Sequence, residues 1–132
     1  MILSIINEKP PVYERCREQF GIDWDRGIVI TYGENIYTKG KTLPSDLIVH
    51  ESVHIDQQLK YGKDKWWDEY FVNPAFRKSQ EVEAYQAQGR FLKKIATDRN
   101  KLHTIFHKIA TNMVQFYGDI FTYSEAMAIL KS

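Results

Sequence analysis

The segment VHESVHIDQQ, from Val49 to Gln58, sets the expected fold because it joins a helical pattern to the motif H-E-x-x-H. Pro44-Ser45-Asp46 supplies a helix start with negative charge in the first turn, and Gly62 supplies a stop. One face of this helix carries Ile48, Ser52, Ile55 and Leu59, and the adjacent face carries Leu47, His50, Glu51, His54 and Gln58. The segment therefore predicts a helix with one face for packing and another for chemistry.

The two histidines of the motif lie one helical turn apart. His50 and His54 can bind one ion from the same face without distorting the backbone. Zinc accepts neutral imidazoles at about 2 Å and, in catalytic sites, keeps one position open for water. Glu51 can reach a water in that open position, which suits a general base. The motif predicts a Zn²⁺ site with Glu51 as the catalytic carboxylate.

Such a site needs a third protein ligand, and the chain offers two kinds. The segment Ser79–Gln86 contains Glu81 and Glu83, which point roughly 200° apart on a helix, so only one of them can face the zinc helix. His103 and His107 are the histidine candidates, and their spacing also allows a second metal site, although exposed polar positions are the favoured interpretation. The layout H-E-x-x-H-x-x-G-x-x-H is excluded because no histidine follows at the required position.

The rest of the chain predicts a small β-structure before this helix and further helices after it. The expected elements are a strand at Ile2–Ile6, a helix at Pro11–Phe20, a hairpin of Gly27–Tyr32 and Asn35–Thr38, a loop at Lys39–Thr42, a helical turn at Lys65–Val72, a long helix capped by Asn73 and reaching about Thr97, an amphipathic stripe from Leu102 to Phe116, and a last helix at Glu125–Leu130 capped by Ser124. The expected fold class is α+β, with residues 1–132 forming a single domain.

Composition and charge exclude several classes of function. The formal net charge of +1 over 132 residues, without a basic stripe, argues against nucleic acid or an anionic membrane as a partner. The apolar run at the start is too short for a signal peptide, and no stretch approaches the roughly 20 apolar residues that span a bilayer. A cytoplasmic location is expected. Cys16 is the only cysteine, and its helical spacing with Val12 and Phe20 indicates a buried small hydrophobe.

The pairing of HESVH with the later EVEAY resembles the gluzincin branch of the zincin metallopeptidases, especially small single-domain members from bacteria and phages. The resemblance covers about residues 28–91. It implies a zincin-like fold in which His50, His54 and Glu81 bind zinc, and in which an edge strand of the hairpin holds extended peptide. Tyr85 stands where the family often has an aspartate that orients a ligand histidine, and tyrosine supplies no negative charge. Glu83 therefore stays an alternative ligand.

These features predict a zinc-dependent metallopeptidase that acts on a peptide or protein substrate, with a monomer favoured. One alternative is a zinc-binding module with little or no activity that binds a protein partner, because a short chain leaves little structure to enclose a cleft. Another is a hydrolase of non-peptide amides such as cell-wall material. The candidate donors to the oxyanion are His103, His107, Tyr117 and Tyr123. Gln57 and Gln58 could line the cleft or hydrogen-bond beneath the site. For Trp66 and Trp67, a packing role is favoured over a role as a substrate platform.

Overall fold

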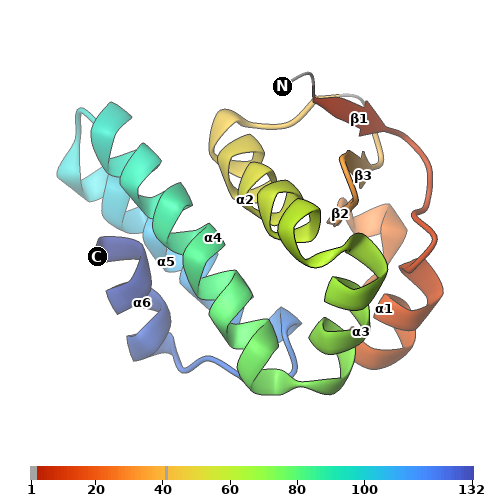
Figure 1. The fold of residues 1–132 in the computed structure, drawn as a ribbon. Coiled ribbons are helices and arrows are strands. Elements are labelled where there is room, and N and C mark those ends of the chain that lie inside the picture. Colours follow the sequence, from red (N-terminus) through yellow and green to blue (C-terminus); the bar gives the residue numbers. More distant parts are fainter. Residues whose placement is uncertain (1–2, 41) are drawn as a thin grey trace.

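The computed structural model describes residues 3–40 and 42–132, and it confirms the expected α+β class (Figure 1). The elements in chain order are β1 (Ser4–Ile6), α1 (Tyr13–Phe20), the 3₁₀ turn η1 (Trp24–Arg26), β2 (Val29–Tyr32), β3 (Asn35–Thr38), α2 (Ser45–Tyr61), α3 (Lys63–Val72), α4 (Pro74–Ile95), α5 (Arg99–Phe116) and α6 (Tyr123–Lys131). Ile2, the expected start of the first strand, and Lys41, in the expected loop, lie outside the described residues.

The described sheet has three strands in the order β1-β3-β2, so β2 is an edge strand. The predicted hairpin is confirmed: β2 and β3 are antiparallel, with Tyr32 opposite Asn35 across the two-residue turn. Gly33 takes a φ of 63°, which glycine adopts without strain. β1 runs parallel to β3 on its other side. One edge of β2 therefore pairs with β3, and the other edge pairs with no strand among the described residues.

Helix α2 packs on β2 through a face that differs slightly from the predicted one. Ile55 is fully buried as expected, but Leu59 is 57% exposed. Gln58 takes the inward position at this end of the helix, since its amide donates to the Thr31 carbonyl and accepts from the Gly33 N–H. The hairpin turn offers unpaired main-chain groups here, and an amide side chain satisfies them where leucine could not.

The predicted helical turn at Lys65–Val72 is a full helix, α3, that begins at Lys63. It packs with α1 and β2 in a cluster that we call the N-terminal cluster, whose buried members are Tyr13, Cys16, Ile30, Trp66, Trp67, Tyr70 and Phe71. Trp66 is 1% exposed and donates its indole N–H to the Gln80 side chain. The predicted packing role of the tryptophans is confirmed. Cys16 is buried as expected, and burial raises the pKa of its thiol to about 12.

Helices α4, α5 and α6 enclose a second group, the C-terminal cluster, whose buried members are Tyr85, Leu92, Phe106, Ala110, Met113, Phe121, Ala126, Met127 and Leu130. Of the predicted stripe, Phe106 and Met113 are buried, whereas Ile105 and Phe116 are about two-fifths exposed. Gly89 lets α4 and α6 approach closely, because a β-carbon there would lie 2.2 Å from the Leu130 carbonyl oxygen. Helices α5 and α6 lie on one side of the α2–α4 pair, and α1 and α3 lie on the other (Figure 1).

Three further helix boundaries differ from the sequence prediction. Helix α1 begins at Tyr13, two residues after the expected Pro11. Helix α4 ends at Ile95, two residues before Thr97, and α6 starts at Tyr123 with Thr122 as its cap in place of Ser124. The Thr122 hydroxyl accepts from the Glu125 N–H, and the Glu125 carboxylate accepts from the Thr122 N–H. This reciprocal capping box satisfies two main-chain donors, which a cap at Ser124 would not do with the same partners.

Arg77 of α4 is 4% exposed and holds three segments together. Its guanidinium donates to the carbonyl of Tyr117, just after α5, and to that of Tyr70 in the last turn of α3. Two helix C-termini, each with partial negative charge, thus converge on one buried cation. This explains how the fold accommodates a buried arginine, and it fixes the position of Tyr117.

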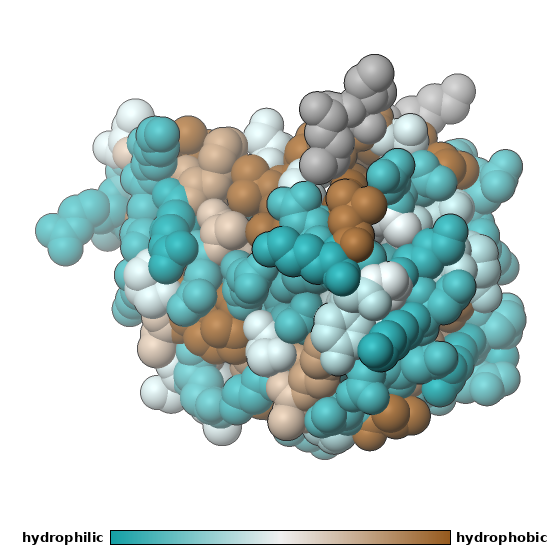
Figure 2. All heavy atoms as spheres, in the orientation of Figure 1, coloured by the Kyte–Doolittle hydropathy of each residue, from teal (hydrophilic) through white to brown (hydrophobic). Residues whose placement is uncertain are grey.

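The face in Figure 2 is covered mainly by hydrophilic residues, with hydrophobic atoms in separate patches between them. Large exposed apolar residues such as Val72 and Ile95 are scattered over different helices. Within residues 3–40 and 42–132, no helix combines the length and apolar character needed to cross a membrane.

Candidate metal centre

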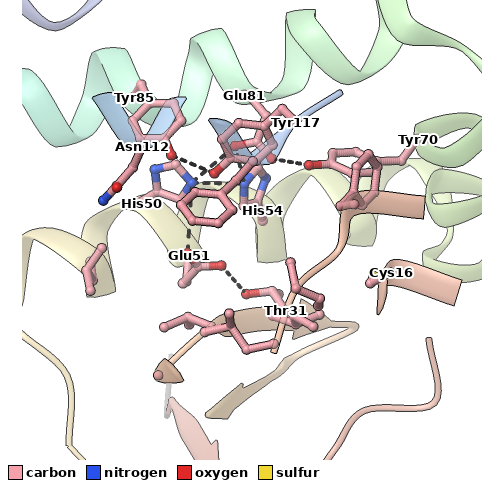
Figure 3. A pocket seen from close by; sticks show the side chains of 18 of the residues that line it. Cys16, Thr31, His50, Glu51, His54, Tyr70, Glu81, Tyr85, Asn112 and Tyr117 are labelled. Carbon is pink, nitrogen blue, oxygen red and sulfur yellow. Dashed lines mark hydrogen bonds and ion pairs between the residues drawn. The ribbon is translucent and has the colours of Figure 1, made fainter. Parts of the chain in front are cut away.

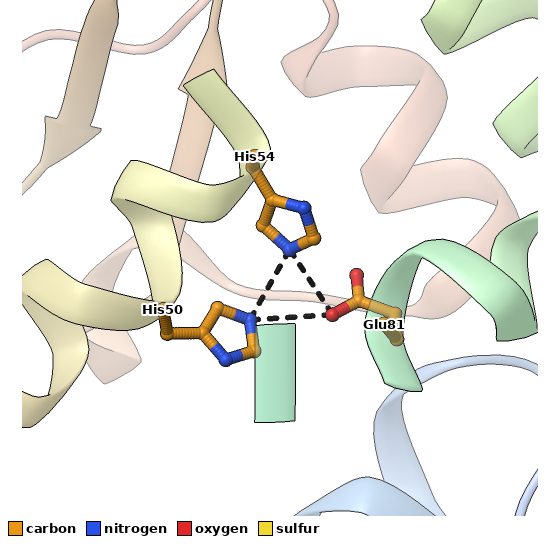
Figure 4. Close-up of side chains that lie close together, drawn as sticks. All are labelled: His50, His54 and Glu81. Carbon is orange, nitrogen blue, oxygen red and sulfur yellow. Dashed lines mark hydrogen bonds and ion pairs between the residues drawn. The ribbon is translucent and has the colours of Figure 1, made fainter. Parts of the chain in front are cut away.

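Three buried side chains from α2 and α4 meet at one point (Figure 4). His50 Nε2 and His54 Nε2 lie 3.2 Å apart, and Glu81 Oε1 lies 3.2 Å from the first and 3.1 Å from the second. The exposed fraction of each residue is 5% or less. Three potential ligand atoms therefore form a nearly equilateral triangle that is shielded from solvent.

The size of this triangle fits a tetrahedral zinc ion. Bonds of about 2.0–2.1 Å at tetrahedral angles place neighbouring ligand atoms roughly 3.3 Å apart. The observed separations of 3.1–3.2 Å are close to that value. Two imidazoles and one carboxylate are also a donor set that catalytic zinc sites use, with a fourth position left for water or substrate. The residues present thus fit zinc in both geometry and chemistry.

A hydrogen-bonded chain fixes the orientation of His50. Its Nδ1 lies 2.9 Å from Gln88 Oε1, and the Gln88 amide donates to Asp46 Oδ2 at 2.8 Å. Because the carboxylate can only accept, the Gln88 nitrogen must face Asp46 and its oxygen must accept from His50 Nδ1–H. The proton therefore resides on Nδ1, and the lone pair of Nε2 points into the triangle.

His54 is oriented in the same way by a different glutamine. Its Nδ1 lies 2.8 Å from Gln57 Oε1, while Gln57 donates to the main-chain carbonyl of Gln80 at 3.0 Å. The carbonyl can only accept, so the Gln57 oxygen must face the imidazole. Of the two expected roles for Gln57, lining the cleft or hydrogen-bonding beneath the site, the structure shows the second. Both histidines thus present Nε2 to the same point.

Glu81 and Tyr85 are positioned by tyrosines. The Tyr70 hydroxyl donates to Glu81 Oε2 at 2.6 Å, which leaves Oε1 facing the histidines. The ring of Tyr85 packs edge-on against His50 with centroids 4.3 Å apart, and its hydroxyl is hydrogen-bonded to that of Tyr117. Tyr85 therefore supports the His50 ring by packing, whereas the charge expected of an aspartate at this position comes from Asp46 through Gln88.

Glu51 stands beside the triangle without belonging to it (Figure 3). Its Oε1 accepts from the Thr31 hydroxyl on β2 at 2.9 Å, and its Oε2 lies 3.9 Å from His50 Nε2. One oxygen is therefore anchored to the sheet while the other faces the position next to the ligand atoms. This is the placement a general base requires.

Charge interactions within the site shift two pKa values in opposite directions. Burial disfavours a charged imidazole, but the adjacent Glu81 carboxylate outweighs it and raises the pKa of His54 to about 9. Burial also disfavours ionised Glu81, yet the charge on His54 and the hydrogen bond between His54 and the carboxylate hold the pKa of Glu81 below its ordinary range. In the metal-free protein the site is thus an imidazolium–carboxylate pair at neutral pH.

A cavity of about 420 Å³ opens beside the triangle. It is lined on one side by β2, and on the other by Asn112 of α5 and by Tyr117, which follows α5 (Figure 3). The hairpin register directs the main-chain groups of Val29 and Thr31 away from β3. The Thr31 carbonyl accepts from Gln58 and Trp67, and both Val29 and Thr31 line the cavity.

The remaining candidates lie elsewhere. Glu83 is exposed on another face of α4, and His103 and His107 are exposed on α5, where His107 Nδ1 is 2.8 Å from the Tyr123 hydroxyl. Of the four candidate oxyanion donors, the structure brings Tyr117 alone to the cavity lining. Four further residues belong to the site and were not predicted from the sequence: Asp46, Thr31, Tyr70 and Gln88. Of these, only Gln88 could have been predicted from helical periodicity, because it lies two turns after Glu81 on the same helix face.

No family model matches the chain, and comparisons with curated proteins and with solved structures also found no match.

The shifted pKa of His54 predicts how the stability of the metal-free protein depends on pH. The pKa of His54 is about 9 in the folded protein, against an ordinary value of 6.5. Protonation of His54 therefore stabilises the fold fully below pH 6.5, and this stabilisation is lost as the pH rises through 9. We expect the free energy of unfolding to fall by roughly 3 kcal/mol across this window. Glu81 stays ionised throughout, because its pKa is shifted downward.

Urea denaturation between pH 6 and pH 9.5, with a chelator present, measures this dependence. The matched control is His54→Gln, which lacks the titrating group and is expected to show a flatter profile. An equally steep decline in that variant would assign the pH dependence to other groups.

Proposed function

We propose that the protein is a zinc-dependent metallopeptidase. The observation that carries the proposal is the triangle of His50, His54 and Glu81 ligand atoms at tetrahedral spacing, with Glu51 anchored beside it by Thr31. The arrangement of a small sheet, a helix bearing H-E-x-x-H and a following helix bearing the third ligand supports a zincin-like fold of the gluzincin type. Peptide hydrolysis is the reaction that this set of groups serves best.

The chain's own residues have distinct parts in the reaction. Zinc, when bound, polarises the scissile carbonyl and lowers the pKa of a coordinated water. Glu51 accepts the proton of the attacking water on the oxygen that faces the site, and it then transfers that proton to the nitrogen of the leaving amine. Thr31 keeps the carboxylate in this orientation through its hydroxyl. Glu51 is thus both the general base and the later general acid.

Tyr117 is the best-placed donor to the negative charge that develops on the substrate carbonyl oxygen. It lines the cavity, and Arg77 holds its main chain in place. Burial raises the pKa of its hydroxyl well above the usual value, so the group stays neutral and can donate. Val29 and Thr31 line the cavity and belong to an edge strand, which suits an extended peptide lying beside β2.

Digestion of a mixed peptide library tests the proposal. We expect the zinc-loaded protein to generate new peptide termini, the chelated protein to generate none, and zinc re-addition to restore cleavage. Mass spectrometry of the products measures the outcome. Zinc bound at one ion per chain with no cleavage of any peptide would contradict the peptidase function and favour a binding module.

A further inference from the structure

The charge of the chain is unevenly distributed. Residues 1–89 contain 11 basic and 14 acidic side chains, whereas residues 90–108 contain six lysines and arginines and a single acidic residue, Asp98. The net charge of +1 is therefore an average over regions of opposite sign. The basic region spans the end of α4 and the first half of α5.

Three helix ends bring cations from this region together. Helix α4 ends at Ile95 and α5 begins at Arg99, so the last turns of one helix adjoin the first turn of the other. Lys93 donates to the main-chain carbonyl of Lys131 at 2.8 Å, which places the end of α6 against the end of α4. Figure 1 shows these helix ends on the side of the molecule away from the sheet. We call this surface the basic end and define it by Arg90, Lys94, Arg99, Lys101 and Lys131.

The cations of the basic end have no carboxylate partners. All five side chains are exposed, and none of the ion pairs among the described residues includes one of them. The one acidic side chain of residues 90–108, Asp98, accepts from the main-chain N–H groups of Asn100 and Lys101 as the cap of α5. The positive charge of the basic end is thus largely uncompensated.

Helix stability does not account for all of these charges. Lys94 and Lys131 lie in the last turns of their helices, where the helix dipole favours cations. Arg99 and Lys101 lie in the first turn of α5, where the dipole favours acidic residues and none is present. Local choices that oppose the stability of an element are expected at functional sites. These two cations therefore point to an anionic partner outside the chain.

An apolar stripe runs beside the cations on α4. Phe91 and Ile95 lie one turn apart, as do Arg90 and Lys94, and the two pairs are offset by about 100° around the helix. Ile95 is 57% exposed, and Phe91 is half-buried. The end of α4 thus presents an apolar side chain next to positive charge. An anionic membrane surface matches both features, because its headgroups attract cations and its acyl boundary accepts apolar side chains.

A nucleic acid matches this surface less well. Single strands are bound by aromatic side chains on which bases stack, and the exposed residues between 90 and 105 include no Phe, Tyr or Trp. Phosphates would neutralise the cations but would leave Ile95 in water. The exposed isoleucine is thus the feature that favours lipid.

We propose that the basic end docks the protein on the surface of anionic lipid membranes. Electrostatic attraction supplies most of the affinity, and insertion of Ile95 among the headgroups adds to it. The basic end is remote from the cavity: Arg99 and Phe116 are the two ends of the 18-residue α5, about 25 Å apart, and Phe116 lines the cavity. Docking therefore leaves the cavity away from the lipid, and the proposal does not depend on the peptidase function.

Co-sedimentation of the full chain with lipid vesicles tests the proposal. We expect vesicles of phosphatidylcholine and phosphatidylserine to bind the protein about 10-fold or more tightly than vesicles of phosphatidylcholine alone, and added salt to weaken binding. Lys94→Glu/Lys101→Glu is expected to lower the affinity for the anionic vesicles by about 100-fold, because two attractions become repulsions. Ile95→Ser is expected to lower it by about 3- to 10-fold. Arg90→Gln/Arg99→Gln provides a second charge variant should the first fail to fold.

The matched control is Lys60→Glu/Lys65→Glu, the same change of net charge at exposed lysines of α2 and α3 that also form no ion pair among the described residues. It should keep an affinity close to that of the wild type. No binding of the wild type to anionic vesicles, or equal losses in the two lysine variants, would overturn the proposal. Tighter binding to a single-stranded oligonucleotide than to the vesicles, undiminished in Ile95→Ser, would overturn it in favour of nucleic acid.

Discussion

Replacing Glu51 by glutamine is expected to lower the rate of peptide hydrolysis by about 10³- to 10⁴-fold and to leave zinc binding intact. Glutamine keeps the shape of the side chain and can still accept the Thr31 hydrogen bond, but it cannot accept the proton of the attacking water. The three ligand atoms are untouched by the change. Initial rates on a fluorogenic peptide, together with metal analysis of the same sample, measure both effects.

The control for this experiment is Glu83→Gln, the same chemical change at an exposed position on α4. It should retain the wild-type rate. Wild-type turnover by Glu51→Gln would show that the base assignment is wrong. Loss of zinc from that variant would show instead that Glu51 is itself a ligand.

The second large effect concerns the third ligand. Glu81→Ala is expected to weaken zinc binding by about 10³-fold or more, because it removes one of three ligands that share the roughly 10–16 kcal/mol of a protein zinc site. It also leaves the buried Tyr70 hydroxyl without its acceptor. Competition with a chromogenic zinc chelator gives the dissociation constants.

Glu83→Ala is the matched control, since it deletes the neighbouring carboxylate of the same segment. We expect its zinc affinity to equal that of the wild type. If Glu81→Ala also kept wild-type affinity, Glu81 would not be the third ligand.

The features that could be predicted from the sequence are those that depend on residues close together along the chain. The i,i+4 spacing of His50 and His54 and the helix start at Pro44–Asp46 are local features, so one segment of sequence was enough to predict them. The hairpin and the helix beginning after Asn73 were readable for the same reason. The identity of Glu81 as the inward carboxylate was left open, because helical periodicity excludes one of two glutamates but does not say which.

The parts that escaped prediction are those that depend on tertiary contact. Asp46 and Gln88 are 42 residues apart in sequence, and their hydrogen bond exists only because α2 and α4 cross at the site. Thr31 reaches Glu51 for a similar reason, from a strand beneath the helix. The capping box at Thr122 was a local signal, yet Ser124 offered a competing cap and obscured it.

X-ray diffraction from zinc-loaded crystals, recorded on both sides of the zinc absorption edge, tests the central claim most directly. We predict a single strong anomalous peak per chain, about 2.0–2.2 Å from His50 Nε2, His54 Nε2 and Glu81 Oε1, with Glu51 beside it and outside bonding distance. A peak bound by other residues, or no peak between α2 and α4, would contradict the account.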